Sequence, residues 1–183
     1  MKPHRARRRL LIPLGLLGLT GCAMFQIPTM EDLQRASAEG ARQDLTSPDA
    51  ATRAEAVEEL GGEGTAEAVQ LIRPALKDGD PRVRTAAARA LKEAGSEGQV
   101  AQAELMMSLQ AEKDPEAAVA MGWTLSGWRM ELTPALPALR SVVQQPDHYL
   151  RYQAALLMSP HVEVMEVAPV YLDTVGTWAE KNL

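Results

Sequence analysis

A fourfold internal repeat is the feature that most constrains what this chain can fold into. The four copies are SPDAATRAEAVEELG from Ser47, DPRVRTAAARALKEAG from Asp80, DPEAAVAMGWTLSGW from Asp114 and QPDHYLRYQAALLMS from Gln145. Their prolines are Pro48, Pro81, Pro115 and Pro146, at spacings of 33, 34 and 31 residues. Such a period indicates supersecondary units that must stack on one another, because a single unit cannot bury its apolar face.

Each copy has the pattern of an amphipathic helix. In the second copy, apolar residues between Val83 and Ala94 recur every three or four positions, as on a helix packed along one side. Each proline is expected at the first helical position, with the preceding Ser or Asp as the cap. Gly61 and Gly95 are predicted to end their helices. Further helical runs lie between the copies without any alternating strand pattern, so the chain is predicted to be all-α, with roughly nine helices in antiparallel pairs.

The segment from Leu71 to Gly95 resembles HEAT repeats, especially the short PBS-lyase-type repeats. The matching residues are Leu76, Asp78, Asp80, Pro81, Val83, Arg84, Ala87, Ala88, Ala90 and Leu91. The resemblance covers about residues 30–180 and is strong over 71–95. The third copy departs from it, with Ala118 at the position of Arg84 and Gly122 in mid-helix. The resemblance implies a short right-handed α-solenoid of about four HEAT-like helical pairs.

The first residues have the pattern of a secretory signal peptide. Five basic residues and no acid precede the run LLIPLGLLGL, Leu10 to Leu19, which is too short to span a membrane. The following Leu19-Thr20-Gly21-Cys22 resembles a bacterial lipobox, which implies cleavage before Cys22 and acylation of its thiol. Cys22 is the only cysteine of the chain, and lipidation would remove an otherwise unpaired thiol. The alternative is a secreted protein that is cleaved elsewhere and keeps a stray thiol.

These features divide the chain into three parts. We expect residues 1–21 to be a lipoprotein signal peptide, residues 22–29 to be the lipidated cysteine with a short linker, and residues 30–183 to be the repeat domain. Ala23 after the cysteine resembles the residue that directs lipoproteins to an outer membrane. The expected location is therefore the cell envelope, lipid-anchored, at the outer membrane.

The charge balance bears on the class of partner. Residues 1–21 hold five of the 19 basic residues and none of the 24 acidic ones, so the remainder has a formal net charge of −10. General nucleic-acid binding needs basic surface to neutralise phosphates. Nucleic acid is thus not an expected partner, whereas envelope proteins and the lipid bilayer, through acylated Cys22, are.

Motifs for catalysis are missing from the sequence. After residues 1–21, only His148 and His161 remain as histidines, and neither precedes a Glu, as the paired His-Glu motifs of HEAT-repeat metal oxygenases would require. There is no Gly-rich phosphate loop and no H-E-x-x-H motif. We therefore expect no enzymatic activity, no catalytic residue, no metal and no cofactor, and we expect His148 at the surface near a helix start.

Arginine recurs at one position of the repeat. Arg53, Arg84 and Arg151 occupy it in the first, second and fourth copies. In repeats of this type such arginines usually pair with acids near the turns and hold neighbouring repeats in register. Asp80 and Asp114 are the acids predicted for this role.

Aligning the arginine positions also aligns the columns that flank the apolar stripe. These columns read Arg82, Thr85 and Arg89 in the second copy, Glu116, Val119 and Trp123 in the third, and Tyr149, Tyr152 and Leu156 in the fourth. Polar surface thus gives way to apolar and aromatic surface, and Trp and Tyr are enriched at binding hot spots. The predicted partner-binding residues are Trp123, Tyr149, Tyr152, Arg82 and Arg89. The alternative is that the large side chains only fill space beside Gly122.

The sequence alone favours a non-catalytic, membrane-anchored scaffold or adaptor in the bacterial cell envelope. Two alternatives stay open at this point, an accessory or regulatory subunit of an envelope enzyme and a lyase-like enzyme. The last helical run is apolar, so the C-terminal end of the array is also expected to stack on another copy or on a partner.

Overall fold

The computed structural model describes residue 29 and residues 39–182, and within this part the regular structure is entirely helical. After a helical segment at residues 39–44, the elements are α2 (Ala50–Glu63), α3 (Ala66–Ile72), η1 (Arg73–Lys77), α4 (Pro81–Glu93), η2 (Gly98–Ala101), α5 (Gln102–Ala111), α6 (Pro115–Gly127), η3 (Thr133–Ala135), α7 (Leu136–Val143), α8 (His148–Met158) and α9 (Val164–Asn182). The expected signal peptide, Cys22 and all of the linker except Thr29 lie outside the described residues.

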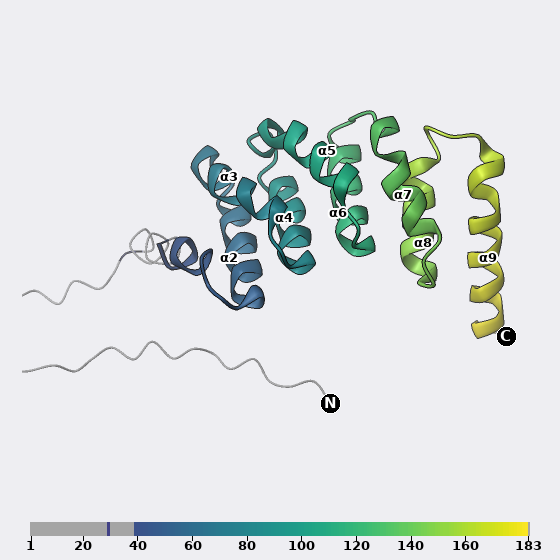
Figure 1. Cartoon of the computed structure of the whole chain (residues 1–183), viewed down its shortest axis with the longest axis horizontal. Helices are drawn as coiled ribbons and strands as arrows, with labels where there is room; N and C mark the ends of the chain where they lie inside the picture. Colours follow the sequence, from purple (N-terminus) through teal and green to yellow (C-terminus); the bar gives the residue numbers. More distant parts are fainter. Residues whose placement is uncertain (1–28, 30–38, 183) are drawn as a thin grey trace, which may run out of the picture.

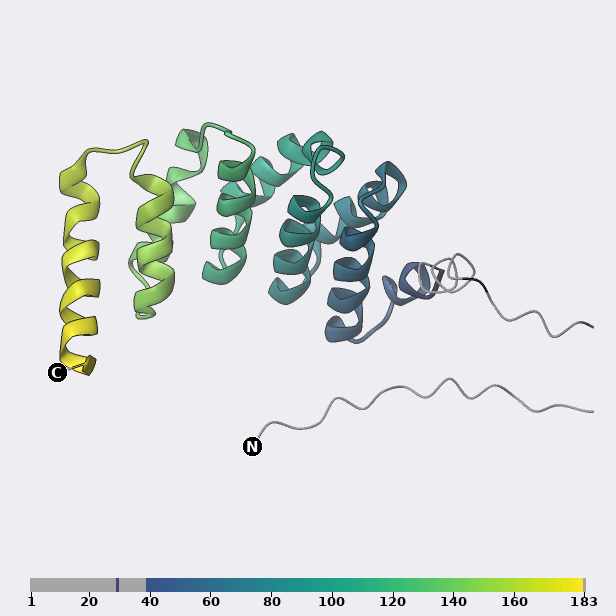
Figure 2. The ribbon, with the colours of Figure 1, turned by 180° about the vertical axis from the view of Figure 1, so that it is seen from behind.

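The helices form a two-layer α-solenoid, as the sequence predicted. Helices α2, α4, α6 and α8 stand side by side in one layer, and α9 follows beside α8 (Figure 1). Helices α3, α5 and α7 form the second layer, and the view from behind shows the same order (Figure 2). The core lies between the layers, where leucines such as Leu60, Leu91, Leu105 and Leu139 are fully buried.

An aspartate begins each helix of the first layer. The caps are Asp49, Asp80, Asp114 and Asp147, and each carboxylate accepts a hydrogen bond from a backbone N–H in its own first turn. Two proline positions were therefore predicted wrongly, because Pro48 and Pro146 precede their caps instead of following them. In both copies the carboxylate after the proline accepts the hydrogen bond from the first turn, so the helix begins at the aspartate.

The glycine predictions had mixed outcomes. Gly95 follows α4 with a φ of 61°, as predicted for a residue that ends a helix. Gly61 was predicted wrongly, because it lies inside α2, which is ended by Gly64 at a φ of 62°. A Cβ added to Gly61 would come within 2.6 Å of the Cα of Ala90, so this glycine lets α2 and α4 approach closely.

Gly122 has a similar packing function one repeat later. A Cβ at this position would lie 2.7 Å from the Cδ1 of Leu157, so Leu157 of α8 fills the space that the glycine leaves on α6. The Leu157 side chain, not an aromatic one, therefore compensates for the missing side chain. The space beside Gly122 is thus filled by an aliphatic side chain and not by the aromatic residues that the sequence singled out.

Candidate functional site

Bidentate arginine pairs tie neighbouring repeats together along one edge of the solenoid. Arg53 donates to both carboxylate oxygens of Asp78, at 2.8 and 2.7 Å, and also to the backbone oxygens of Ser47 and Pro48. Arg84 repeats this arrangement one unit later. It donates to both carboxylate oxygens of Glu112, at 2.7 Å each, and to the backbone oxygen of Asp78 at 2.8 Å.

Glu112 is the most enclosed acid of this edge. Its side chain is 3% exposed, against 18% for Arg84. Burial alone would raise the pKa of Glu112, but the Arg84 guanidinium and the backbone N–H groups of Asp114 and Lys113 outweigh it and hold the pKa below its usual value. For Asp78, the hydrogen bond from Arg53 similarly lowers the pKa. Both acids are therefore charged members of structural ion pairs.

The arginines join neighbouring elements, but the predicted acids were wrong. Asp80 and Asp114 cap their own helices, and Asp80 also binds Arg82, which lowers its pKa to about 2. The acids that receive the arginines lie two residues before these caps, because the turn there directs their side chains back to the preceding repeat. In the fourth copy, Arg151 lies 3.0 Å from Asp173 of α9.

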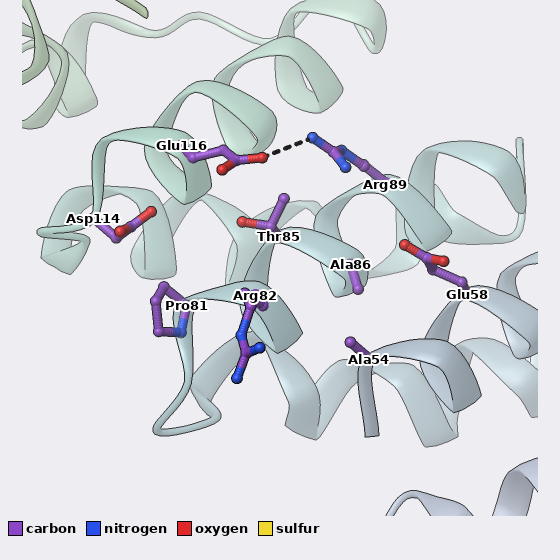
Figure 3. A pocket seen from close by; sticks show the side chains of 9 residues that line it. All are labelled: Ala54, Glu58, Pro81, Arg82, Thr85, Ala86, Arg89, Asp114 and Glu116. Carbon is purple, nitrogen blue, oxygen red and sulfur yellow. Dashed lines mark hydrogen bonds and ion pairs between the residues drawn. The ribbon is translucent and has the colours of Figure 1, made fainter. Parts of the chain in front are cut away.

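The face of the first layer carries two adjacent grooves. Counted from the capping aspartate, the second, fifth and ninth residues of α4 and α6 line them, as the column alignment predicted. In α8 only the second residue, Tyr149, does so, and Tyr152 and Leu156 line neither groove. The first groove lies over α2, α4 and α6, and Arg82, Thr85 and Arg89 line it together with Glu58 and Glu116. Figure 3 shows Arg89 of α4 reaching toward Glu116 of α6. This groove is small, with a hollow of about 230 Å³, and most of its lining residues are polar or charged.

The second groove is larger and carries the aromatic residues. It lies over α4, α6 and α8, encloses a hollow of about 510 Å³, and has Val119, Trp123, Tyr149 and Leu150 as its apolar part. The indole Nε1 of Trp123 donates to the Oε1 of Gln153 at 2.6 Å, which fixes the ring across the joint between α6 and α8. Tyr149 is 69% exposed, so its ring is free to contact a partner.

Tyr152 does not line the second groove, although the sequence placed it with Trp123 and Tyr149. Its ring meets that of Tyr171 edge-on, with centroids 5.7 Å apart. Tyr171 in turn donates its hydroxyl proton to the backbone oxygen of Ala155. The fifth residue after a cap lies on the side of its helix that faces the next helix along the chain in this layer. For α8 the next helix is α9, which occupies the space beside Tyr152. Tyr152 is therefore a packing residue of the α8–α9 joint.

Basic side chains lie at the α4 side of the grooves. Arg82 binds its own cap, Asp80, while Arg89 lies 3.3 Å from Glu116 in a pair whose side chains are 56% and 62% exposed. Lys92 lines the second groove and forms no ion pair within the described part of the chain. The sequence analysis missed Lys92 and Gln153, although their positions within the repeat could have shown that they share this face.

The histidines bind carboxylates at the surface. His148, the first residue of α8, lies 3.2 Å from Asp173, and His161 lies 2.7 Å from Glu131. Among residues 39–182, no three His, Cys, Asp or Glu side chains are grouped so that they could hold a metal ion. Within the same part of the chain, no helix has both the length and the apolar character needed to cross a bilayer.

The layers, the capped helices and the grooves define a short α-solenoid with an open, grooved face. Residues 38–126 match the family model of HEAT repeats, which supports a HEAT-repeat family. The matched segment includes residues 71–95, where the sequence resemblance is strongest. The comparison with curated proteins gave no match. HEAT repeats commonly mediate protein–protein interaction, and this is the class of function that the fold supports.

Proposed function

We propose that this protein is a non-catalytic, lipid-anchored scaffold or adaptor of a bacterial cell envelope that holds a protein partner in the second groove. The observation that carries the proposal is that a fixed indole, Trp123, and an exposed phenol, Tyr149, line the same groove together with apolar and charged side chains. Aromatic anchors of this kind dominate the binding energy of protein interfaces. Arg53 and Arg84, by contrast, already form structural ion pairs within the chain.

The lining of the groove supports a proposal about the chemistry of the partner. Lys92 lies at the α4 side and forms no ion pair with another described residue, and Val119 and Leu150 provide apolar surface. A segment that inserts an apolar side chain between Trp123 and Tyr149 and places a carboxylate next to Lys92 would match both features. The proposed partner is thus a protein segment in which an acidic residue flanks an apolar one.

The anchor is proposed from the lipobox and the short linker. Residues 23–29 span at most about 25 Å when extended, so acylation of Cys22 would hold the solenoid close to the membrane. The partner would then be a membrane protein or another protein at the membrane surface. The net charge of −10 without residues 1–21 gives no attraction to anionic headgroups, so attachment would depend on the acyl chains.

The groove is tested by a photocrosslinking residue placed at Tyr149, with Met107 as the control position, since Met107 is also exposed but lies on α5 in the other layer. The proposal predicts that one envelope protein crosslinks from position 149 and not from 107. With that protein purified, Trp123→Ala should weaken binding at least tenfold, and Lys92→Glu should weaken it with a reduced dependence on salt. Equal crosslinking from both positions, or unchanged affinity in both variants, would refute the proposal that the second groove binds the partner.

The anchor is tested separately. Cys22→Ser should move the protein from the membrane fraction to the soluble fraction, and the wild-type mass should show an N-terminal Cys22 with its acyl groups. A wild-type protein that is soluble and unmodified would refute lipidation, but it would leave the groove experiment unaffected.

A further inference from the structure

The outer face of α9 is an apolar stripe. Met165, Pro169, Leu172 and Gly176 are all exposed, and Met165 and Leu172 are 80% and 73% exposed. Val167 and Val170, on the opposite side of the same helix, are buried against the rest of the solenoid. Successive positions four, three and four residues apart lie on one side of an α-helix, so the four stripe residues form a continuous surface.

The spacing of the stripe is the same when read in either direction. Two copies of α9 packed antiparallel about a twofold axis between residues 170 and 171 would place Met165 of one copy beside Gly176 of the other. The same axis would bring Pro169 of one copy beside Leu172 of the other. The long side chain of Met165 therefore faces Gly176, which has no side chain. The branched side chain of Leu172 faces the compact ring of Pro169. We propose that this stripe binds a second copy of the chain, forming an antiparallel α9–α9 dimer.

The charges beside the stripe fit this arrangement. Glu166 and Asp173 lie on the same flank of α9 and would approach the equivalent acids of the second copy. Each acid already has a cation from its own chain, since Glu166 lies 2.6 Å from Arg140 and Asp173 lies 3.0 Å from Arg151. Like-charge repulsion between the copies is thereby reduced. An unrelated acidic protein would form no new ion pair at this flank, because Arg140 and Arg151 already bind Glu166 and Asp173.

The size of the stripe sets the expected strength. From residue 165 to residue 176 a helix rises about 16 Å, so the contact lies at the low end of specific interfaces and the dimer should be weak. If the proposed lipid anchor is correct, confinement to a membrane would raise the effective concentration and favour the dimer there.

The test is sedimentation equilibrium of residues 23–183 between about 1 and 300 µM. Every residue of the described helices is retained, and circular dichroism checks each variant for native helix content. The wild type should dimerise, and Leu172→Glu should weaken dimerisation at least tenfold. Gly176→Met should do the same, because an added Cβ at Gly176 meets nothing within 4 Å in its own chain but would collide with Met165 of the other copy.

A compensating variant and a matched control make the test specific. Met165→Ala combined with Gly176→Met exchanges the large and small partners, so it should restore the dissociation constant to within about threefold of the wild type. Gly62→Met, on a position of α2 that is equally open, should leave it unchanged. A wild type that is monomeric at 300 µM, or a Gly176→Met variant that dimerises normally, would overturn the proposal. Failure of the double variant to restore binding would overturn the antiparallel pairing.

Discussion

Replacing Arg84 by Met tests whether the edge pairs hold the repeats together. The substitution keeps an unbranched apolar chain but removes both hydrogen bonds to Glu112, whose side chain is 3% exposed. Breaking a buried pair by removing one partner costs about 3–5 kcal/mol. Glu112 would keep the backbone N–H groups of Lys113 and Asp114, at 2.9 Å each, so the lower limit of about 3 kcal/mol applies.

Arg89 on the same helix provides the matched control. It also pairs with a glutamate of the next repeat, Glu116, but the two side chains are 56% and 62% exposed. An exposed pair of this kind contributes about 0–1 kcal/mol, so Arg89→Met should change the free energy of unfolding by less than about 1 kcal/mol. The comparison thus varies the burial of the pair while the residue type, the helix and the substitution stay the same.

Urea unfolding and thermal melts, both followed by circular dichroism, would measure both variants. At about 2–4 °C per kcal/mol for a chain of this size, Arg84→Met should lower the melting temperature by about 6–12 °C. Arg84→Met combined with Glu112→Gln should recover part of the loss, because the buried charge is removed while an acceptor for the backbone N–H groups remains. Equal losses in Arg84→Met and Arg89→Met, or no recovery in the double variant, would refute a structural role for the pair.

Two further predictions concern packing and pH. Gly61→Ala should destabilise the fold by a few kcal/mol in urea unfolding, because its Cβ would overlap Ala90, whereas Gly62→Ala, with nothing within 4 Å, should be neutral or stabilising. Stability should fall as the pH drops below 4.5, the ordinary value for Glu112, through its lowered folded-state pKa. In Arg84→Met this part of the acid-induced loss should disappear, which thermal melts at pH 3–7 would measure.

The helices of the repeat could be predicted from the sequence because their signals are local. An aspartate next to a proline, followed by apolar residues every three or four positions, specifies a capped amphipathic helix without reference to the rest of the chain. The exact cap was less certain, since Asp49 and Asp147 follow their prolines while Asp80 precedes its own. The choice depends on which side chain reaches the free N–H groups, and only three-dimensional geometry decides it.

Contacts between repeats were harder to predict because they depend on how the turns direct side chains. The positions that arginine occupies follow from the period, but the partners Asp78 and Glu112 are selected by turns in which both acids also accept backbone N–H groups. The period alone likewise cannot separate a glycine that ends a helix from one that permits close packing. Gly61 lies inside α2 and faces Ala90, whereas Gly64 has a φ of 62° and faces open space.

The joint between α6 and α8 explains why the aromatic groove lies where it does. The third copy has Ala118 where the others have arginine, so the edge pair that ties the earlier repeats has no equivalent there. The two helices are linked instead by Leu157 against Gly122 and by the hydrogen bond from Trp123 to Gln153. That hydrogen bond also forms part of the groove. A partner held there as proposed would therefore contact the same side chains that set the angle between the third and fourth repeats, and binding would be coupled to the curvature of the solenoid.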